Sequence, residues 1–182
     1  EIDAAARRSS AEPVIQIASA TEGRRMTRIA LVNHDMPFLV DSVASAIAAQ
    51  GLAIDRLVHP VVGAVRDADG TLQAIAADES SVRESMIYIE ADRVDARQRR
   101  DLDKALRQTL NDVHVAVRDW PKLRAAMRDD AAGLGDREAA ALLEWLEGGM
   151  LTQLAIWSAT VTAATATRSA SAAAARATCW PM

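Results

Sequence analysis

The alternation of apolar and polar residues predicts a hairpin followed by a helix at the start of the chain. Short β-branched runs indicate strands at 14–17 and 26–32, separated by a turn signal at residues 21–23. From Leu39 to Ile47 apolar residues recur at three- and four-residue steps, and Gly51 follows them. This pattern is typical of an amphipathic helix that ends at a glycine.

The next segment, residues 52–65, is rich in β-branched residues and is interrupted by Pro60. Proline cannot donate a ladder hydrogen bond, so we expect it at an edge, a bend or a bulge. Residues 67–70 then predict a hairpin turn, and strands follow at 72–76 and 85–90.

Apolar residues at helical spacing predict a long helix over 95–117, with polar residues on its other faces. Two shorter helices are expected after it, one following Pro121 and one from Arg137 to Glu147. Beyond Met150 the composition changes sharply, because only Arg168 and Arg176 are charged and no helical or alternating pattern remains.

Together these elements predict an α+β fold of the ferredoxin-like kind, in the order ββαββα, with an antiparallel sheet and helices on one of its faces. Short C-terminal helices and an irregular tail follow. We divide the chain into a flexible lead (1–11), the sheet-and-helix domain (12–120), a helical extension (121–150) and a low-complexity tail (151–182).

Composition narrows the range of partners. The 182 residues carry a net charge of −4 and are only 3% aromatic, which argues against nucleic-acid binding. No apolar run is long enough to span a membrane, and the single cysteine, Cys179, excludes an internal disulfide and a thiolate zinc cluster. We therefore expect a cytoplasmic protein without nucleic-acid or membrane partners.

Candidate chemistry is concentrated between the second strand and the first helix. Asn33, His34 and Asp35 form this junction, and Asp41 lies in the following helix. The N-terminus of a helix presents free amides that suit a carboxylate such as that of an amino acid. The alternative, favoured on spacing alone, is that Asp35 caps the helix and Asn33 closes a turn, with Pro37 in the first helical turn.

Polar residues elsewhere in the chain are weaker candidates for a functional site. His59 precedes Pro60 in a strand, where it could reach a ligand or simply pack at the strand edge. His114 lies alone on the long helix and is interpreted as structural. The chain contains no phosphate-binding loop, dinucleotide fingerprint or paired metal-binding histidines, so we assign no catalytic, cofactor-binding or metal-binding residue.

The segment from Ile29 to Val43, which contains Asn33-His34-Asp35-Met36-Pro37-Phe38-Leu39-Val40-Asp41-Ser42, resembles the amino-terminal region of the large bacterial NAD-specific glutamate dehydrogenases. Further matches follow in order. They are Gly51-Leu52 with Ile54, residues 58–61, 67–70, 84–90, Asp119-Trp120-Pro121, and Glu138-Ala139 leading to Leu143 and Trp145-Leu146. The resemblance covers roughly residues 12–154.

This resemblance implies an ACT-like domain in the non-catalytic part of a very long polypeptide. ACT domains commonly bind amino acids at a strand-to-helix loop, often across a subunit interface, and regulate attached enzymes. The parent family oxidatively deaminates L-glutamate to 2-oxoglutarate with NAD, which is bound far downstream. The implied partners are the remaining domains of the enzyme, a second copy of the full-length protein and an amino-acid effector. The candidate loop comprises Asn33, His34, Asp35, Met36, Pro37, Phe38, Asp41 and His59.

Two departures from the family pattern matter. His34 replaces the first residue of an Asp-Asp pair, which weakens a fixed anionic role for the loop. After Leu154 the family's aromatic strand is missing, and we predict that this segment is translated out of frame in an amino-terminal fragment of the enzyme. The functional alternatives are a stand-alone amino-acid-sensing module and a purely structural packing domain.

Overall fold

The computed structural model describes residues 4, 6–8, 12–20, 25–76, 81–150, 160–162 and 165–167. The chain divides into two compact units, residues 1–113 and 114–182, and each is described by itself. This boundary falls inside a helix, seven residues before position 120, where we expected the sheet-and-helix domain to end.

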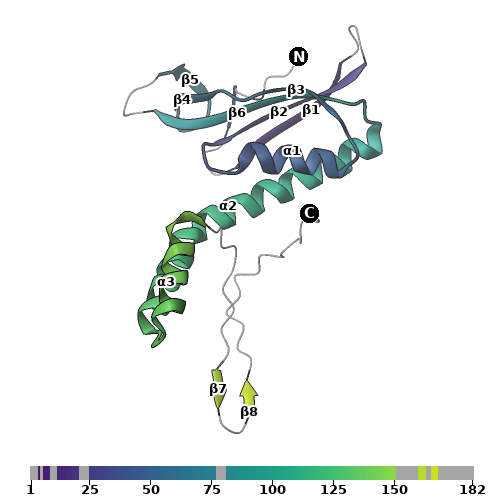
Figure 1. Ribbon diagram of the computed structural model, residues 1–182. Coiled ribbons are helices and arrows are strands. Elements are labelled where there is room, and N and C mark those ends of the chain that lie inside the picture. The colour runs from purple at the N-terminus through teal and green to yellow at the C-terminus, as the bar shows by residue number, and fades with distance from the viewer. Residues whose placement is uncertain are drawn as a thin grey trace. The chain divides into compact units, whose positions relative to one another are not determined.

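An antiparallel sheet forms the centre of the first unit (Figure 1). Its strands run in the order β1-β2-β6-β4-β5, and β3 pairs with β6 off this path. The bounds are β1 Val14–Ala20, β2 Met26–His34, β3 Ile54–Val58, β4 Val61–Arg66, β5 Leu72–Ile75 and β6 Val82–Ala91. The predicted α+β, ACT-like fold is confirmed.

Strands β3 and β4 share one edge of β6, because Pro60 interrupts what would otherwise be a single strand. β3 pairs with the second half of β6 and β4 with its first half. The Met86 amide donates to the Pro60 carbonyl at 2.9 Å, across the break. The expected bend at Pro60 is therefore present, and four strands rather than two lie between the helices.

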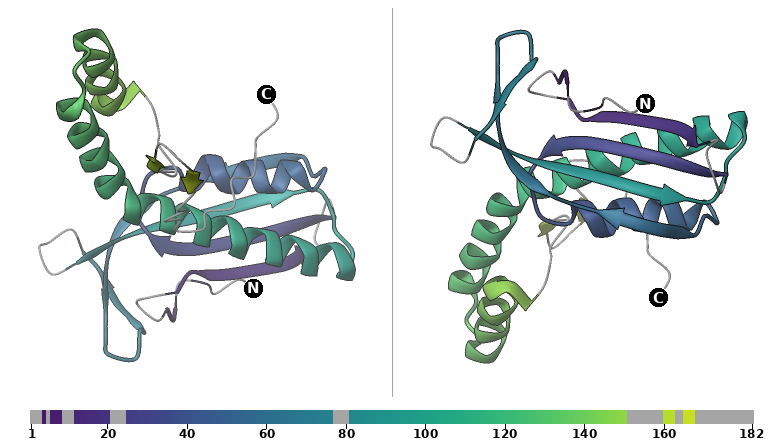
Figure 2. Two further views of the ribbon diagram at one scale, coloured as in Figure 1. Left: turned by 90° about the horizontal axis from the view of Figure 1, so that it is seen from below. Right: turned by 90° about the horizontal axis from the view of Figure 1, so that it is seen from above.

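Two helices cover one face of this sheet. Helix α1 (Leu39–Ala49) and the part of α2 (Ala96–Gly133) up to Val113 lie side by side beneath the strands (Figures 1 and 2). The buried residues of these helices are Leu39, Val43, Ile47, Leu102, Leu106, Leu110 and Val113. On β2 and β6, every second residue from Ile29 and Ile87 is buried on this face. The alternating apolar residues of the strands and the apolar faces of the helices therefore pack in one core.

Local signals set the helix ends. Gly51 follows α1 with φ +73° and its amide donates to the Ala48 carbonyl, as its position after the last apolar residue predicts. Asp95 caps α2 by accepting from the Arg97 and Gln98 amides, while the Gln98 side chain accepts from the Asp95 amide. This reciprocal pair is a capping box.

The second unit contains the rest of α2 and helix α3 (Arg137–Trp145), followed by a short π-helical segment, η1 (Leu146–Met150). The predicted helix boundary near Pro121 is wrong, because α2 continues through this residue. A proline removes one helical hydrogen bond without obliging the helix to end. Glu147 forms ion pairs with Arg124 at 2.8 Å and Arg128 at 3.1 Å within this unit.

The opposite face of the sheet carries part of the N-terminal segment, although we expected residues 1–11 to be a flexible lead. The Arg8 amide donates to the Gly70 carbonyl, and the Leu72 amide donates to the Ala6 carbonyl. Ala4 is buried with Ala30 and Val32. Residues 6–8 are thus part of the fold, tied to the hairpin between β4 and β5.

Predictions about the tail fall mostly outside the described residues. Within it the structure describes two short antiparallel strands, β7 (Thr160–Thr162) and β8 (Thr165–Thr167). The out-of-frame hypothesis for the segment after Leu154 is untouched by this. Among the described residues, no helix has the length and apolar character needed to cross a membrane.

Candidate functional site

The end of β2 separates two neighbours that the sequence placed in one cluster. In the β2–β6 register Asn33 is opposite Ser85, and His34 is opposite Glu84. Successive residues of a strand point to opposite faces. Asn33 therefore lies on the helix side of the sheet and His34 on the other side, where it lines a pocket.

Asp35 continues from β2 and is held by the start of β6. Its amide donates to the Arg83 carbonyl at 3.0 Å, and its Oδ1 accepts from the Ser85 hydroxyl at 2.8 Å. The Arg83 guanidinium reaches Oδ2 at 3.3 Å. The interpretation of Asp35 as the helix cap is wrong, because its carboxylate is bound to β6 instead.

Helix α1 begins later than the sequence suggested. Pro37 lies in a turn before the helix, and the N-cap residue is Phe38, with φ 70° and ψ −3° and no side-chain cap. A left-handed phenylalanine is a strained conformation that the surroundings must hold in place. Asp41 lies in the first turn, where its charge interacts favourably with the helix dipole. The first-turn amides therefore receive no oxygen from the capping side chain.

His59 comes to the same place from the break between β3 and β4. Its Nε2 lies 3.1 Å from the Ser85 Oγ, so the fully buried Ser85 joins His59 to Asp35. We call His59, Ser85, Asp35 and Arg83 the helix-side network. Sequence reasoning named His59 and Asp35 but missed Ser85 and Arg83, because only the register of β2 against β6 places them there.

The proton positions in this network follow from its chemistry. An ionised aspartate only accepts, so the Ser85 hydroxyl donates to Asp35 and its oxygen accepts from His59. In a nucleophilic triad the histidine lies between serine and aspartate and removes the serine proton. Here the serine lies in the middle, and the arrangement holds the loop rather than activating Ser85.

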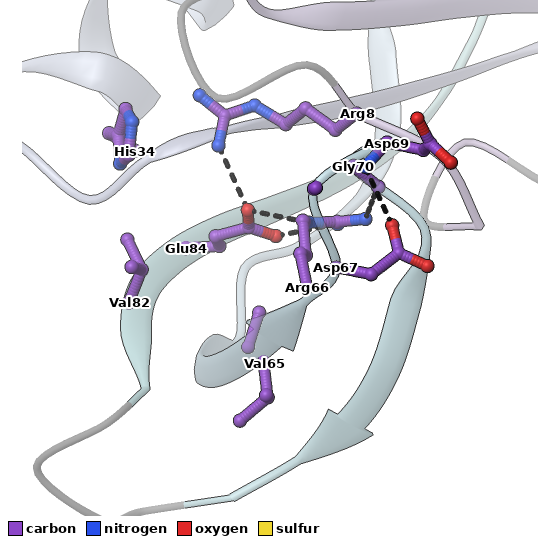
Figure 3. A pocket seen from close by; sticks show the side chains of 11 residues that line it. Arg8, His34, Val65, Arg66, Asp67, Asp69, Gly70, Val82 and Glu84 are labelled. Atoms are coloured by element: carbon purple, nitrogen blue, oxygen red, sulfur yellow. Dashed lines mark hydrogen bonds and ion pairs between the residues drawn. The ribbon is translucent and has the colours of Figure 1, made fainter.

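A second polar cluster lies on the opposite face and was not predicted. Glu84 accepts from Arg8 NH1 at 2.9 Å and, in a bidentate pair, from Arg66 Nε at 2.9 Å and NH2 at 2.8 Å (Figure 3). Arg8 and Glu84 are each only 1% exposed. We call these three residues the far-side cluster.

Electrostatics in the far-side cluster favour the charged carboxylate. Burial by itself would raise the pKa of Glu84, but the hydrogen bonds from Arg66 and Arg8 outweigh it and leave the pKa below the usual 4.5. Nearby, Asp67 closes the β4–β5 hairpin. The pKa of Asp67 is lowered chiefly by the hydrogen bond from the Thr71 amide.

Comparison with known proteins places this fold and its strand-to-helix loop in a family. Residues 2–106 match the family model described as glutamate dehydrogenase, ACT1 domain. The chain belongs to this family. The match extends over the whole sheet, α1 and the start of α2, so the ACT1 domain includes both the helix-side network and the far-side cluster.

Two longer relatives are similar to this ACT1 domain. The NAD-specific glutamate dehydrogenase of Halomonas elongata is 32% identical over 136 residues, which covers 66% of this chain and 8% of that protein. The protein of the same name from Pseudomonas aeruginosa is 33% identical over 135 residues, again 66% and 8%. The chain thus spans less than a tenth of the length of either relative. Their name gives NAD as the cofactor of these two relatives.

Proposed function

We propose that this chain is a non-catalytic, amino-terminal regulatory and oligomerisation domain of an NAD-dependent glutamate dehydrogenase, an enzyme that oxidatively deaminates L-glutamate to 2-oxoglutarate. The ACT1 family match supports this role. So does the helix-side network, in which the Ser85 hydroxyl donates a hydrogen bond to Asp35 and serves to fix the loop. On this proposal the chain itself carries no catalytic, NAD-binding or metal-binding residue.

The partners we propose are the remaining domains of the enzyme and a second copy of the full-length protein. Apolar side chains at the loop and at the β3–β4 break support a packing role. Phe38 is 37% exposed, and Val58 and Val61 are also exposed. Such residues give a neighbouring domain an apolar surface to bury.

An amino-acid effector is the second candidate, and the start of α1 favours it. Helix α1 has eleven residues, and its N-cap Phe38 supplies no side-chain oxygen to the first-turn amides. The loop residues Asn33, His34, Asp35, Met36, Pro37 and Phe38, with Asp41 and His59, are the proposed contact set. A free-standing sensor would use the same loop without any attached enzyme.

A chimera of the Pseudomonas aeruginosa relative tests the main proposal. The segment of that enzyme that aligns with this chain is replaced by the corresponding residues of this chain. We expect the chimera to assemble and to oxidise glutamate with NAD within about tenfold of the natural enzyme. Deletion of the same segment should abolish assembly. A deletion variant that assembles and reacts normally would contradict the proposal.

The effector role is tested on the full chain, residues 1–182, by titration with a panel of amino acids. The sensing hypothesis predicts saturable binding at the strand-to-helix loop, and Asp35→Ala should abolish binding there by releasing the loop from Ser85 and Arg83. Absence of binding at this loop across the panel, with the chimera active, would leave the packing role alone.

A further inference from the structure

We propose that the pocket beside Arg8 is a binding site for the carboxylate group of a small organic acid, with the Arg8 guanidinium as its principal donor. The pocket lies on the sheet face opposite the helices and shares only His34 with the strand-to-helix loop. The site is therefore distinct from the effector loop, and it does not depend on the role proposed for the whole chain.

Arg8 is the key observation, because one of its nitrogens is buried without a partner. Its Nε donates to the Glu12 carbonyl at 3.0 Å, and NH1 donates to Glu84 at 2.9 Å. Within the part of the chain that the structure describes, NH2 has no hydrogen-bond partner, although the residue is almost completely buried. A buried donor of this kind is stabilised when an acceptor is supplied.

The other members of the far-side cluster cannot supply that acceptor. Arg66 uses NH1 on the Gly70 carbonyl and its other two nitrogens on Glu84. Both oxygens of Glu84 are already bound by guanidinium groups. Two guanidinium groups thus share one carboxylate, and Nη2 of Arg8 is the donor of this cluster that remains for a further acceptor.

The space next to this cluster suits a small molecule. The pocket has a volume of about 370 Å³, at the lower end of the range for small-molecule sites, roughly 300–1,000 Å³. Its walls combine Ala64, Val65 and Val82 with the ring of His34 and the polar cluster. Figure 3 shows Glu84 between Arg66 and Arg8, with His34 and Val82 together on one side of Glu84.

The charges of the lining select the type of anion. Asp67 and Asp69 lie on the hairpin side of the pocket. The Asp67 oxygens are occupied by the Asp69 and Thr71 amides and by the Gln73 side chain, and both aspartates are exposed. These carboxylates repel a dianionic phosphate more strongly than a singly charged ligand.

Direct titration of the full chain tests the site with three probes: propionate, L-alanine and inorganic phosphate. Propionate and L-alanine present the same carboxylate on three carbons, and alanine adds an ammonium group that Asp69 could attract. We expect saturable binding of both carboxylates in calorimetry or NMR, and weaker binding of phosphate. Tighter binding of phosphate than of either carboxylate, or no saturable binding of any probe, would overturn the proposal.

Matched variants locate the binding at Arg8. Arg8→Lys keeps the charge but loses the remaining guanidinium nitrogen, Nη2, and carboxylate binding should weaken by about tenfold or more. Arg7→Gln removes the adjacent, exposed arginine, whose Nε donates to the Asp69 carbonyl, and binding should stay unchanged. Equal losses in the two variants would show only a general charge effect and would contradict the assignment.

A second pair keeps the test decisive if Arg8→Lys does not fold. Val82 lines the pocket and is 48% exposed, so it tolerates a polar side chain. Val82→Glu places a negative charge at the wall and should weaken carboxylate binding about tenfold more than the isosteric Val82→Gln. Equal affinities of these two variants would place the ligand elsewhere.

Discussion

Ser85 and Glu84 are neighbours on β6, yet they organise two very different polar regions. Ser85 faces the helices and lies at the centre of a network in which its own donor and acceptor are both used. Glu84 faces the other side and meets two guanidinium groups, one of which has a buried nitrogen without a hydrogen-bond partner among the described residues. The alternation of a single strand thus separates a closed structural network from a cluster with an unfilled donor.

This difference has an energetic meaning. In the helix-side network the charged members lie at the surface, since the Asp35 side chain is 28% and the Arg83 side chain 73% exposed. Water can replace lost partners there. In the far-side cluster the charges are buried, so removal of one partner leaves another charge without compensation. The two regions should therefore respond to mutation by different amounts.

The largest effect is expected for Glu84→Gln, which leaves two guanidinium groups without their counter-charge. We predict a loss of about 3–5 kcal/mol in the free energy of unfolding, measured by chemical denaturation. Glu90→Gln is the control on the same strand and face, because its ion pairs to Arg28 and Arg56 are longer, at 4.0 and 3.8 Å, and their arginines are exposed. Equal losses of stability in Glu84→Gln and Glu90→Gln would contradict the larger effect predicted for the buried far-side cluster.

Acid should act on the same cluster in the wild-type protein. The folded state lowers the pKa of Glu84 below 4.5, so the ionised form contributes stability above that pH and the contribution disappears as the pH falls through the folded pKa. We expect the Glu84 carboxyl to remain ionised below pH 4.5 in a carbon NMR titration. A midpoint at or above 4.5 would show that burial outweighs the two arginines.

A smaller effect is expected for Ser85→Ala, which disconnects His59 and Asp35. The lost bond involves a charged acceptor, so we predict about 2 kcal/mol of destabilisation. NMR should show changed resonances for the His59 ring and the 33–38 loop. A stability loss without any change at His59 would argue against the bond between His59 and Ser85.

The smallest effect is expected for Arg83→Gln. This ion pair with Asp35 is 3.3 Å long, and its arginine is largely exposed. Exposed pairs contribute about 0.2–1 kcal/mol, and added salt should reduce the difference between variant and wild type. A loss as large as that of Ser85→Ala would mean that Arg83 stabilises the helix-side network as strongly as Ser85 does.

Local signals in the sequence predict much of the fold. Gly51, Pro60 and Gly70 each occupy the backbone position that their chemistry suggested, and Gly70 has a positive φ of 81°. The helix end predicted near Pro121 was wrong, because a long helix such as α2 tolerates the loss of one hydrogen bond. The prediction for Asp35 was wrong because its carboxylate binds Ser85 and Arg83 on β6, a strand distant in the sequence, and does not cap α1.

The polar regions were harder to predict because both depend on pairing between distant segments. Ser85 meets Asp35 across 50 positions, and Arg8 meets Glu84 across 76. Apolar alternation shows that β6 is a strand, but it does not show which residue of β2 lies opposite Ser85. Likewise, no local signal in residues 1–11 predicts that Ala6 and Arg8 bind the β4–β5 hairpin and β6, because these contacts are formed with residues 70–84.

The contrast between the two regions is tested most directly by mapping where a carboxylate binds. The full chain, labelled with ¹⁵N, is titrated with propionate while backbone and arginine side-chain signals are recorded. We predict saturable shifts at Arg8, Arg66 and Gly70, with little change at residues 36–41. Shifts confined to residues 36–41, or none at all, would contradict an open donor in the far-side cluster.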